Sequence, residues 1–241
     1  MKIIITKNYD EMSYEAFKIM KDVVVNNPNG VIGLATGTTP LGLYANMIKD
    51  CKENGTSYKN IRTVNLDEYC GLDINSDQSY VYFMRANLFN GLDIDLNNTN
   101  IEDGKAKDKE KECARYNEVL HNNQQDIQLL GIGSDGHIAF NEPGTPFGSE
   151  THIAELAEST IKDNARLFND ISEVPTSAFT QGLKNIMNAK KILIIANGAN
   201  KAKAVHDMLL GPVTEDCPAS VLQLHPDCTL VCTEDAATLI K

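Results

Sequence analysis

The chain has 241 residues, of which 42% are hydrophobic and 23% charged, and its formal net charge is −11 at pH 7. These proportions are typical of a globular protein and exclude disorder, collagen and coiled coil as the main architecture. The negative charge repels polyanions such as DNA, and no apolar run reaches the roughly 20 residues of a membrane span, so we expect neither a nucleic-acid nor a membrane role.

Short β-branched runs alternate along the chain with segments whose apolar residues recur at helical spacing. The expected strands cover 2–6, 31–35, 62–66, 127–131, 191–196, 219–223 and 229–232. The expected helices cover 12–23, 41–51, 79–88, 107–120, 177–189 and 202–210, with a further short helix at the end of the chain. This alternation predicts a doubly wound, Rossmann-like α/β fold, in which a mostly parallel sheet carries helices on both faces.

No linker divides the chain, so we expect a single catalytic domain over 1–241, with a lid around 143–176 because that stretch is the least regular. The first six residues are too short and too β-branched for a signal peptide, which favours a cytoplasmic location. The six cysteines form no Cys-x-x-Cys pair and have no His at zinc-ligand spacing. We therefore predict reduced, buried cysteines and no metal site.

Ligands of doubly wound sheets bind at the carboxyl ends of the strands. Polar residues follow four of the expected strands, in the segments 36–40, 67–69, 133–137 and 197–201. The first segment, Thr36-Gly37-Thr38-Thr39-Pro40, leads into a helix whose free amides favour a phosphate, although a simple capping turn fits as well. A nucleoside triphosphate is not indicated, because Leu43 and Tyr44 stand where a Walker loop has Lys and Ser or Thr.

The segment 135–143 places an imidazole, that of His137, between the carboxyl groups of Asp135 and Glu142. Flanking carboxylates hold a histidine in one tautomer and suit it to proton transfer near neutral pH. The alternative is a hydrogen-bonded loop histidine without a chemical role. The Gly-x-Gly-x-x-Gly pattern over 131–136 is a weak dinucleotide signal, because Pro143 follows too soon for the required helix.

Three further charged residues follow strands or lie in polar stretches. Asp67 ends an otherwise apolar strand and is either a helix cap or a carboxylate base in the cleft. Lys201 begins a helix, where a cation is unfavourable unless it serves an anion, and Arg166 lies in an irregular polar stretch. Taken alone, either cation is also explained as a solvated surface charge.

The order and spacing of these motifs resemble those of the glucosamine-6-phosphate deaminases. The resemblance rests on Asp135-Gly136-His137-Ile138-Ala139-Phe140-Asn141-Glu142-Pro143, together with the segments 34–40, 65–69, 164–166, 198–201 and 222–226. It covers essentially the whole chain. Because related 6-phosphogluconolactonases share only the Asp-Gly-His part of this loop, a sugar-phosphate lactonase remains an alternative, as does a non-catalytic sugar-phosphate sensor.

The resemblance implies conversion of glucosamine 6-phosphate and water to fructose 6-phosphate and ammonia, without metal or organic cofactor. His137 would open the sugar ring, oriented by Asp135 and Glu142, and Asp67 would carry the proton from C2 to C1. The implied phosphate and sugar ligands are Thr36, Gly37, Thr38, Thr39, Arg166 and Lys201. Allosteric hexameric members carry basic residues after the catalytic loop, where this chain has His152-Ile153-Ala154-Glu155. We therefore expect a non-allosteric enzyme that is a monomer or small homo-oligomer.

Overall fold

The computed structural model describes residues 1–156 and 174–240 and contains a seven-stranded, entirely parallel sheet. Its strands, in spatial order, are β1 (Lys2–Thr6), β10 (Cys228–Thr233), β9 (Ile192–Ala196), β6 (Ile127–Leu130), β2 (Val31–Leu34), β3 (Arg62–Asn65) and β5 (Thr99–Asn100). The predicted α/β fold with a mostly parallel sheet is confirmed. Among the described residues no helix is long and apolar enough to cross a membrane.

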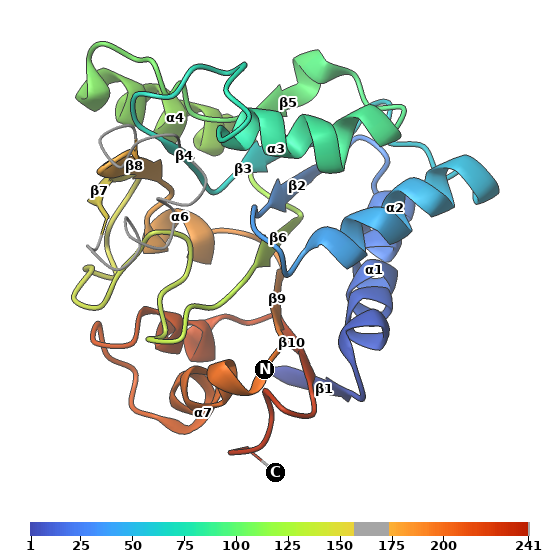
Figure 1. Cartoon of the computed structure of the whole chain (residues 1–241), viewed down its shortest axis with the longest axis vertical. Helices are drawn as coiled ribbons and strands as arrows, with labels where there is room; N and C mark the ends of the chain where they lie inside the picture. Colours follow the sequence, from blue (N-terminus) through green and yellow to red (C-terminus); the bar gives the residue numbers. More distant parts are fainter. Residues whose placement is uncertain (157–173, 241) are drawn as a thin grey trace.

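Helices cover both faces of this sheet, as predicted. They are α1 (Tyr9–Asn26), α2 (Leu41–Asn54), α3 (Tyr80–Asn87), α4 (Lys109–Asn122), α6 (Leu183–Met187) and α7 (Ala202–Leu210), with short 3-10 segments at η1 (Phe89–Gly91), η2 (Leu96–Asn98), η5 (Ala199–Lys201) and η6 (Pro218–Leu224). Figure 1 shows α1 and α2 on one side of the sheet and α4, α6 and α7 on the other. Polar side chains start several of these helices: Asn8, Ser79 and Asp108 each accept a hydrogen bond from a first-turn N–H group.

The direction of winding reverses between β2 and β6, which are adjacent in the sheet. The chain leaves β2 for β3 on one side of this pair, whereas it leaves β6 toward β9 on the other side. The loops that follow β2 and β6 therefore diverge at their carboxyl ends and leave a crevice between them. This topological position is where a ligand site is expected in such a sheet.

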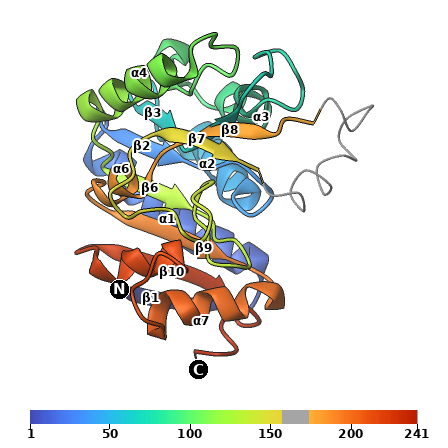
Figure 2. The same cartoon turned by 90° about the vertical axis from the view of Figure 1, so that its left-hand side faces the viewer.

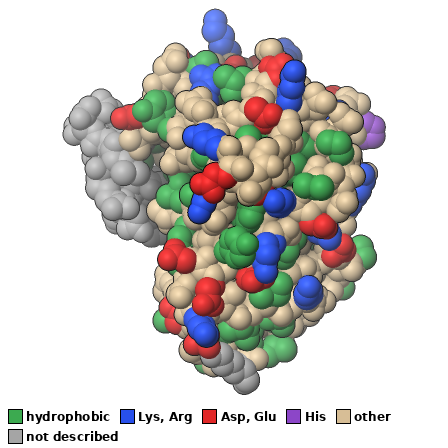
Figure 3. All heavy atoms as spheres, turned by 90° about the vertical axis from the view of Figure 1, so that its right-hand side faces the viewer, with side chains coloured by type: hydrophobic (Ala, Val, Ile, Leu, Met, Phe, Trp, Pro, Cys, Tyr) green, Lys and Arg blue, Asp and Glu red, His purple; other side chains and the backbone are tan. Residues whose placement is uncertain are grey.

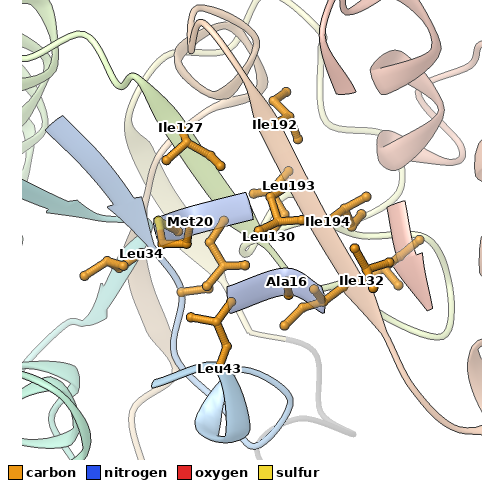
Figure 4. Packing of buried hydrophobic residues seen from close by; sticks show 14 of the residues in the cluster. Ala16, Met20, Leu34, Leu43, Ile127, Leu130, Ile132, Ile192, Leu193 and Ile194 are labelled. Atoms are coloured by element: carbon orange, nitrogen blue, oxygen red, sulfur yellow. The ribbon is translucent and has the colours of Figure 1, made fainter. Parts of the chain in front are cut away.

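The core lies between the central strands and α1. Figure 4 shows Ala16 and Met20 of α1 facing Leu34 of β2 and Leu130 of β6. All residues of β2, β6 and β9 are buried, so these strands show no alternation of apolar and polar residues. This pattern is that of a parallel sheet whose two faces are both covered by helices. All six cysteines lie among the described residues and are thiols that form no disulfide, and five of them are buried.

A second, three-stranded antiparallel sheet was not predicted. It consists of β4 (Asp67–Tyr69), β8 (Ser177–Thr180) and β7 (His152–Glu155), and it lies between α4, which contacts β7, and α3, which contacts β4 (Figure 2). The prediction of a helix over 177–189 is therefore wrong for its first part, because residues 177–180 pair with two strands instead. The helix is limited to α6, and the expected irregular segment after Pro143 includes a strand.

Two further predictions near the end of the chain are wrong. Residues 219–223 form η6 rather than a strand, because Pro218 starts a helical turn and the Ala219 N–H donates to the Gly136 carbonyl oxygen instead of a strand ladder. Residues after Thr233 form hydrogen-bonded turns rather than a short helix.

Figure 3 shows basic and acidic side chains interspersed on the face that α1 and α2 cover. A mixed surface of this kind is not one that a polyanion such as DNA would be expected to bind.

Candidate functional site

A cavity of about 550 Å³ opens at the carboxyl edge of the main sheet, at the crevice beside β2 and β6. It is lined by Ala35, Thr36, Gly37, Thr39, Pro40, Leu66, Asp67, Tyr80, Gly131, Ile132, Gly133, Ser134, Asp135, His137, Ala139, Phe140, Glu142 and Lys201. These residues come from all four of the predicted loops. The structure therefore brings the carboxyl group at 67 and the imidazole at 137 to one crevice, beside the loop predicted to hold a phosphate.

The loop after β2 is shaped by a glycine and tied to α1 by a tyrosine. Gly37 has a φ of +102°, a conformation that glycine adopts without strain. The Tyr9 hydroxyl lies 3.1 Å from the carbonyl oxygens of both Thr38 and Thr39 and accepts a hydrogen bond of 2.8 Å from the Gly42 N–H. The start of α2, with its partial positive charge, therefore faces the cavity edge in a fixed position.

Asp67 begins β4 and lies at the floor of the cavity with 6% of its surface exposed. Its Oδ1 atom has no hydrogen-bond partner among the described residues. Burial, and next the neighbouring Glu68 charge, raise the pKa of Asp67 to about 8. A carboxyl group whose pKa is this close to neutrality is populated in both its protonated and its ionised form near neutral pH. It therefore accepts a proton and returns it more readily than an ordinary aspartate does.

His137 lies in a compact loop with both flanking acids. Its Nδ1 atom is 2.7 Å from Asp135 Oδ1 and 3.7 Å from Glu142 Oε2, and the residue lines the cavity. Gly133 makes this position possible, because a Cβ atom there would lie 2.3 Å from the imidazole. The three side chains predicted to act together are thus in contact.

The pKa values of the two flanking acids are shifted in opposite directions. Burial opposes ionisation of Asp135, but the facing His137 charge and backbone N–H groups lower its pKa below the ordinary value. Burial raises the pKa of Glu142, and the charge of Asp135 adds to this effect while His137 offsets part of it. Burial also lowers the pKa of the Lys201 ammonium group at the cavity wall. Such separation of neighbouring carboxyl groups is typical of sites that perform acid and base steps.

The loop that carries His137 is held in a strained shape. Ala139 has a φ of +54°, which is uncommon for a residue with a side chain. The Gly133 N–H donates to the His137 carbonyl oxygen at 2.9 Å, and the Phe140 N–H donates to Thr180 Oγ1 at 3.1 Å. Because Thr180 pairs with Asp67 across the small sheet, the loop and the buried carboxyl group are positioned by the same element.

Sequence reasoning did not identify Tyr80 as a residue of the cavity. Tyr80 begins α3, and its ring lies parallel to that of Phe140, with an interplanar angle of 3° and centroids 6.4 Å apart. Phe140 belongs to the motif over 135–143, but the nine residues between β4 and Ser79 give no signal that the chain returns to the cavity. The fold of that connection determines this contact.

Two of the predicted ligand residues are not placed in the cavity. Thr38 is not among the lining residues, and only its carbonyl oxygen is engaged, with Tyr9 and the Leu41 N–H. Arg166 lies outside the described residues, as does the central part of the predicted lid. The roles of both residues stay predictions.

The group Asp135, His137 and Glu142 also has the composition of a cation site, since one ligand atom from each lies within 4.8 Å of the others. Nδ1 and Oδ1 are 2.7 Å apart, which is the distance of a direct ion-pair contact between the two side chains. This arrangement favours a proton-transfer role, and metal dependence is tested below with a chelator.

Three comparisons relate the chain to known proteins. Residues 8–231 match the family model of glucosamine-6-phosphate isomerases/6-phosphogluconolactonase. The chain is 49% identical over 239 residues to a glucosamine-6-phosphate deaminase of Clostridium novyi (99% of each chain), and 48% identical over 241 residues to one of Lactobacillus delbrueckii subsp. bulgaricus (100% of each chain). A solved structure described as a monomeric glucosamine-6-phosphate deaminase superposes with a TM-score of 0.95 at 43% identity, covering 99% of this chain and 100% of that one. A 6-phosphogluconolactonase of Trypanosoma brucei has a TM-score of 0.81 at 18% identity over 100% and 98% of the two chains, a likeness of fold alone.

Proposed function

The chain belongs to the family of glucosamine-6-phosphate isomerases and 6-phosphogluconolactonases, and we infer that within it the chain is a deaminase, converting glucosamine 6-phosphate and water to fructose 6-phosphate and ammonia. The observation that carries this inference is the convergence of Asp67 and His137 on one cavity. An aldose-to-ketose shift requires one group to open the ring and a second to move a proton between adjacent carbons. The cavity supplies one candidate for each task.

The first step is opening of the pyranose ring by His137. The imidazole accepts the proton of the anomeric hydroxyl and donates a proton to the ring oxygen as the bond between the anomeric carbon and that oxygen breaks, which leaves an open-chain aldehyde. Asp135 stabilises the protonated imidazole through the 2.7 Å contact, and Glu142, with its raised pKa, is the second proton carrier of the group.

The second step uses Asp67, whose unpartnered carboxylate takes the C2 proton and returns it to C1. The intermediate is an enolamine, and the resulting imine at C2 is hydrolysed to fructose 6-phosphate and ammonia. In the free protein the carboxyl group is half protonated at about pH 8. The ammonium group at C2 of the bound substrate opposes the effect of burial and favours the ionised, basic form.

The phosphate group is proposed to lie at the loop after β2, where the backbone of Gly37, the side chains of Thr36 and Thr39 and the start of α2 converge. Lys201 faces the same cavity and supplies the positive charge within the described residues. Thr38 and Arg166 complete the proposed set by resemblance. The segment 143–176 is proposed as the lid over this site.

The proposed function is tested by measuring ammonia and fructose 6-phosphate from purified protein given glucosamine 6-phosphate. Both products should form in equal amounts, and Asp67→Asn should abolish both. A lactonase needs no base for a C2 proton, so this variant would retain hydrolysis of 6-phosphogluconolactone if that were the activity. Failure of the wild-type protein to release ammonia would refute the deaminase assignment.

We further propose that the enzyme is a monomer without activation by N-acetylglucosamine 6-phosphate. The related solved structure is described as monomeric, and the segment His152–Glu155 carries no Lys or Arg. Light scattering should give a mass near that of one chain, and the acetylated sugar phosphate should leave the rate unchanged. A sigmoidal rate curve that the acetylated sugar abolishes would refute the proposal. The expected cytoplasmic location stays a prediction.

A further inference from the structure

Glu68, the residue next to the proposed base, is buried and fully bonded although it is not among the residues that line the cavity. It is 1% exposed. Its Oε1 atom accepts hydrogen bonds from the backbone N–H groups of Tyr69 (2.8 Å) and Tyr80 (3.0 Å), and Oε2 accepts one from Val81 (3.0 Å). Burial raises the pKa of Glu68, and these three N–H groups offset part of that effect because they stabilise the ionised carboxylate.

Two of these three N–H groups belong to the first turn of α3, where the backbone has no partner within the helix. The Ser79 hydroxyl accepts the next one, from Tyr82, at 3.1 Å. Glu68 therefore neutralises the positive end of α3 and fixes the helix against β4. The position of the first residue of α3, Tyr80, is set by this contact.

Tyr80 transmits that position to the opposite side of the cavity. The centroids of the Tyr80 and Tyr69 rings are 4.8 Å apart. The Tyr80 ring also stacks on that of Phe140, which lies three residues beyond His137 in the chain. The loop that bears His137 thus packs on the side chain of Tyr80, and Glu68 accepts a hydrogen bond from the backbone of the same residue. On the other side, Glu68 is joined directly to Asp67.

We propose that Glu68 is a positioning residue of the reaction, which holds α3 against β4 and thereby sets the distance between the Asp67 carboxyl group and the His137 loop through the Tyr80–Phe140 stack. This proposal rests on the proposed function. It also has an electrostatic consequence: the Glu68 charge adds to burial in raising the pKa of Asp67.

The test is the variant Glu68→Gln, which keeps the shape of the side chain but removes the charge and one acceptor oxygen. The first measurement is the NMR titration of the Asp67 carboxyl carbon in the substrate-free protein, assigned by comparison with Asp67→Asn. We expect the midpoint to fall from about 8 in the wild type toward the ordinary range. The second is the pH profile of kcat/KM for ammonia release, whose acid limb should move to lower pH by the same amount.

We also expect kcat of Glu68→Gln to fall on the order of 100-fold, because the Asp67 carboxyl group and the His137 imidazole are no longer held at their native distance. The effect on KM should be smaller. The matched control is Glu118→Gln, an exposed site on α4 whose change should leave midpoint, profile and kcat unchanged. The titration needs no substrate, so it reports on Glu68 even if the deaminase assignment fails. A kcat of Glu68→Gln equal to that of Glu118→Gln would overturn the positioning role, and an Asp67 midpoint that does not move would overturn its electrostatic consequence.

A second pair of variants tests the stack without altering Glu68. Tyr80→Phe retains the ring against Phe140, whereas Tyr80→Leu removes it. We expect Tyr80→Leu to have a kcat at least about tenfold below that of Tyr80→Phe, because only the former releases the His137 loop. Equal kcat values for the two folded variants would contradict the positioning role.

Discussion

Asp67→Asn should make the protein more stable while it removes the activity. In the folded state the carboxyl group titrates at about pH 8, whereas its ordinary value, expected in the unfolded chain, is 3.8. Above pH 3.8 the unfolded chain therefore ionises this group while the folded protein keeps it protonated, and unfolding is favoured. The destabilisation increases with pH up to about 8 and is constant above that value.

The free energy of unfolding falls by about 1.4 kcal/mol for each pH unit between the pKa of the unfolded chain and that of the folded protein. The destabilisation is therefore about 2 kcal/mol at pH 5 and about 4 kcal/mol at pH 7. An amide at position 67 does not ionise and avoids this cost. For a domain of this size, about 4 kcal/mol corresponds to a Tm increase on the order of 10 °C. The loss of a general base lowers kcat by roughly 10²–10⁴-fold.

Urea unfolding of the wild type, Asp67→Asn and the exposed control Asp216→Asn at pH 5 and pH 7 measures these differences. The stability gain of Asp67→Asn should be about twice as large at pH 7 as at pH 5, and the control should show no such dependence. A variant that is no more stable than the wild type at pH 7, or whose gain does not depend on pH, would refute the assignment of a buried carboxyl group with a raised pKa.

Four further outcomes follow from the site. The acid limb of kcat/KM should rise with pH and have its midpoint near pH 8, since the free enzyme must ionise Asp67; a midpoint near pH 4 would contradict the raised pKa. Gly133→Ala should lower kcat on the order of 100-fold, because the new Cβ atom would lie 2.3 Å from the imidazole, whereas the exposed control Glu118→Gln should be neutral in the same assay. Lys201→Met should raise KM roughly tenfold with a smaller effect on kcat, as expected for a group that binds the phosphate in both ground and transition states; an unchanged KM would remove Lys201 from the site. Treatment with EDTA should leave ammonia release unchanged, and loss of activity that Zn²⁺ or Mg²⁺ restores would assign the carboxylate–imidazole group to a metal.

Most of the main sheet was predictable because its strands are short and largely apolar, as strands buried on both faces are, whereas β5, with only two polar residues, was not predicted. The rule that ligands bind at the carboxyl ends of the strands then predicted that Asp67 and His137 lie close together, without any knowledge of contacts. The small sheet escaped prediction because β4 has only three residues and because Ser177–Thr180 fits a helical spacing equally well. Pairing between segments more than 80 residues apart, as between β4 and β8, leaves no local trace in a sequence.

The unpredicted sheet is also what makes Asp67 a special residue. The chain leaves the parallel sheet at Leu66 and pairs instead with β8, so the carboxyl group enters a buried layer between the two sheets. In a plain doubly wound sheet an aspartate after a strand would lie in a solvated loop, with an ordinary pKa. Here β4 pairs with β8, and the Oδ1 atom has no hydrogen-bond partner among the described residues, which destabilises the folded state and leaves the carboxylate available to a proton on the substrate. Residues such as Thr180 and Glu68, which make no contact with the cavity, maintain this arrangement, and so the reactivity of the site depends on the strand pairing beneath it.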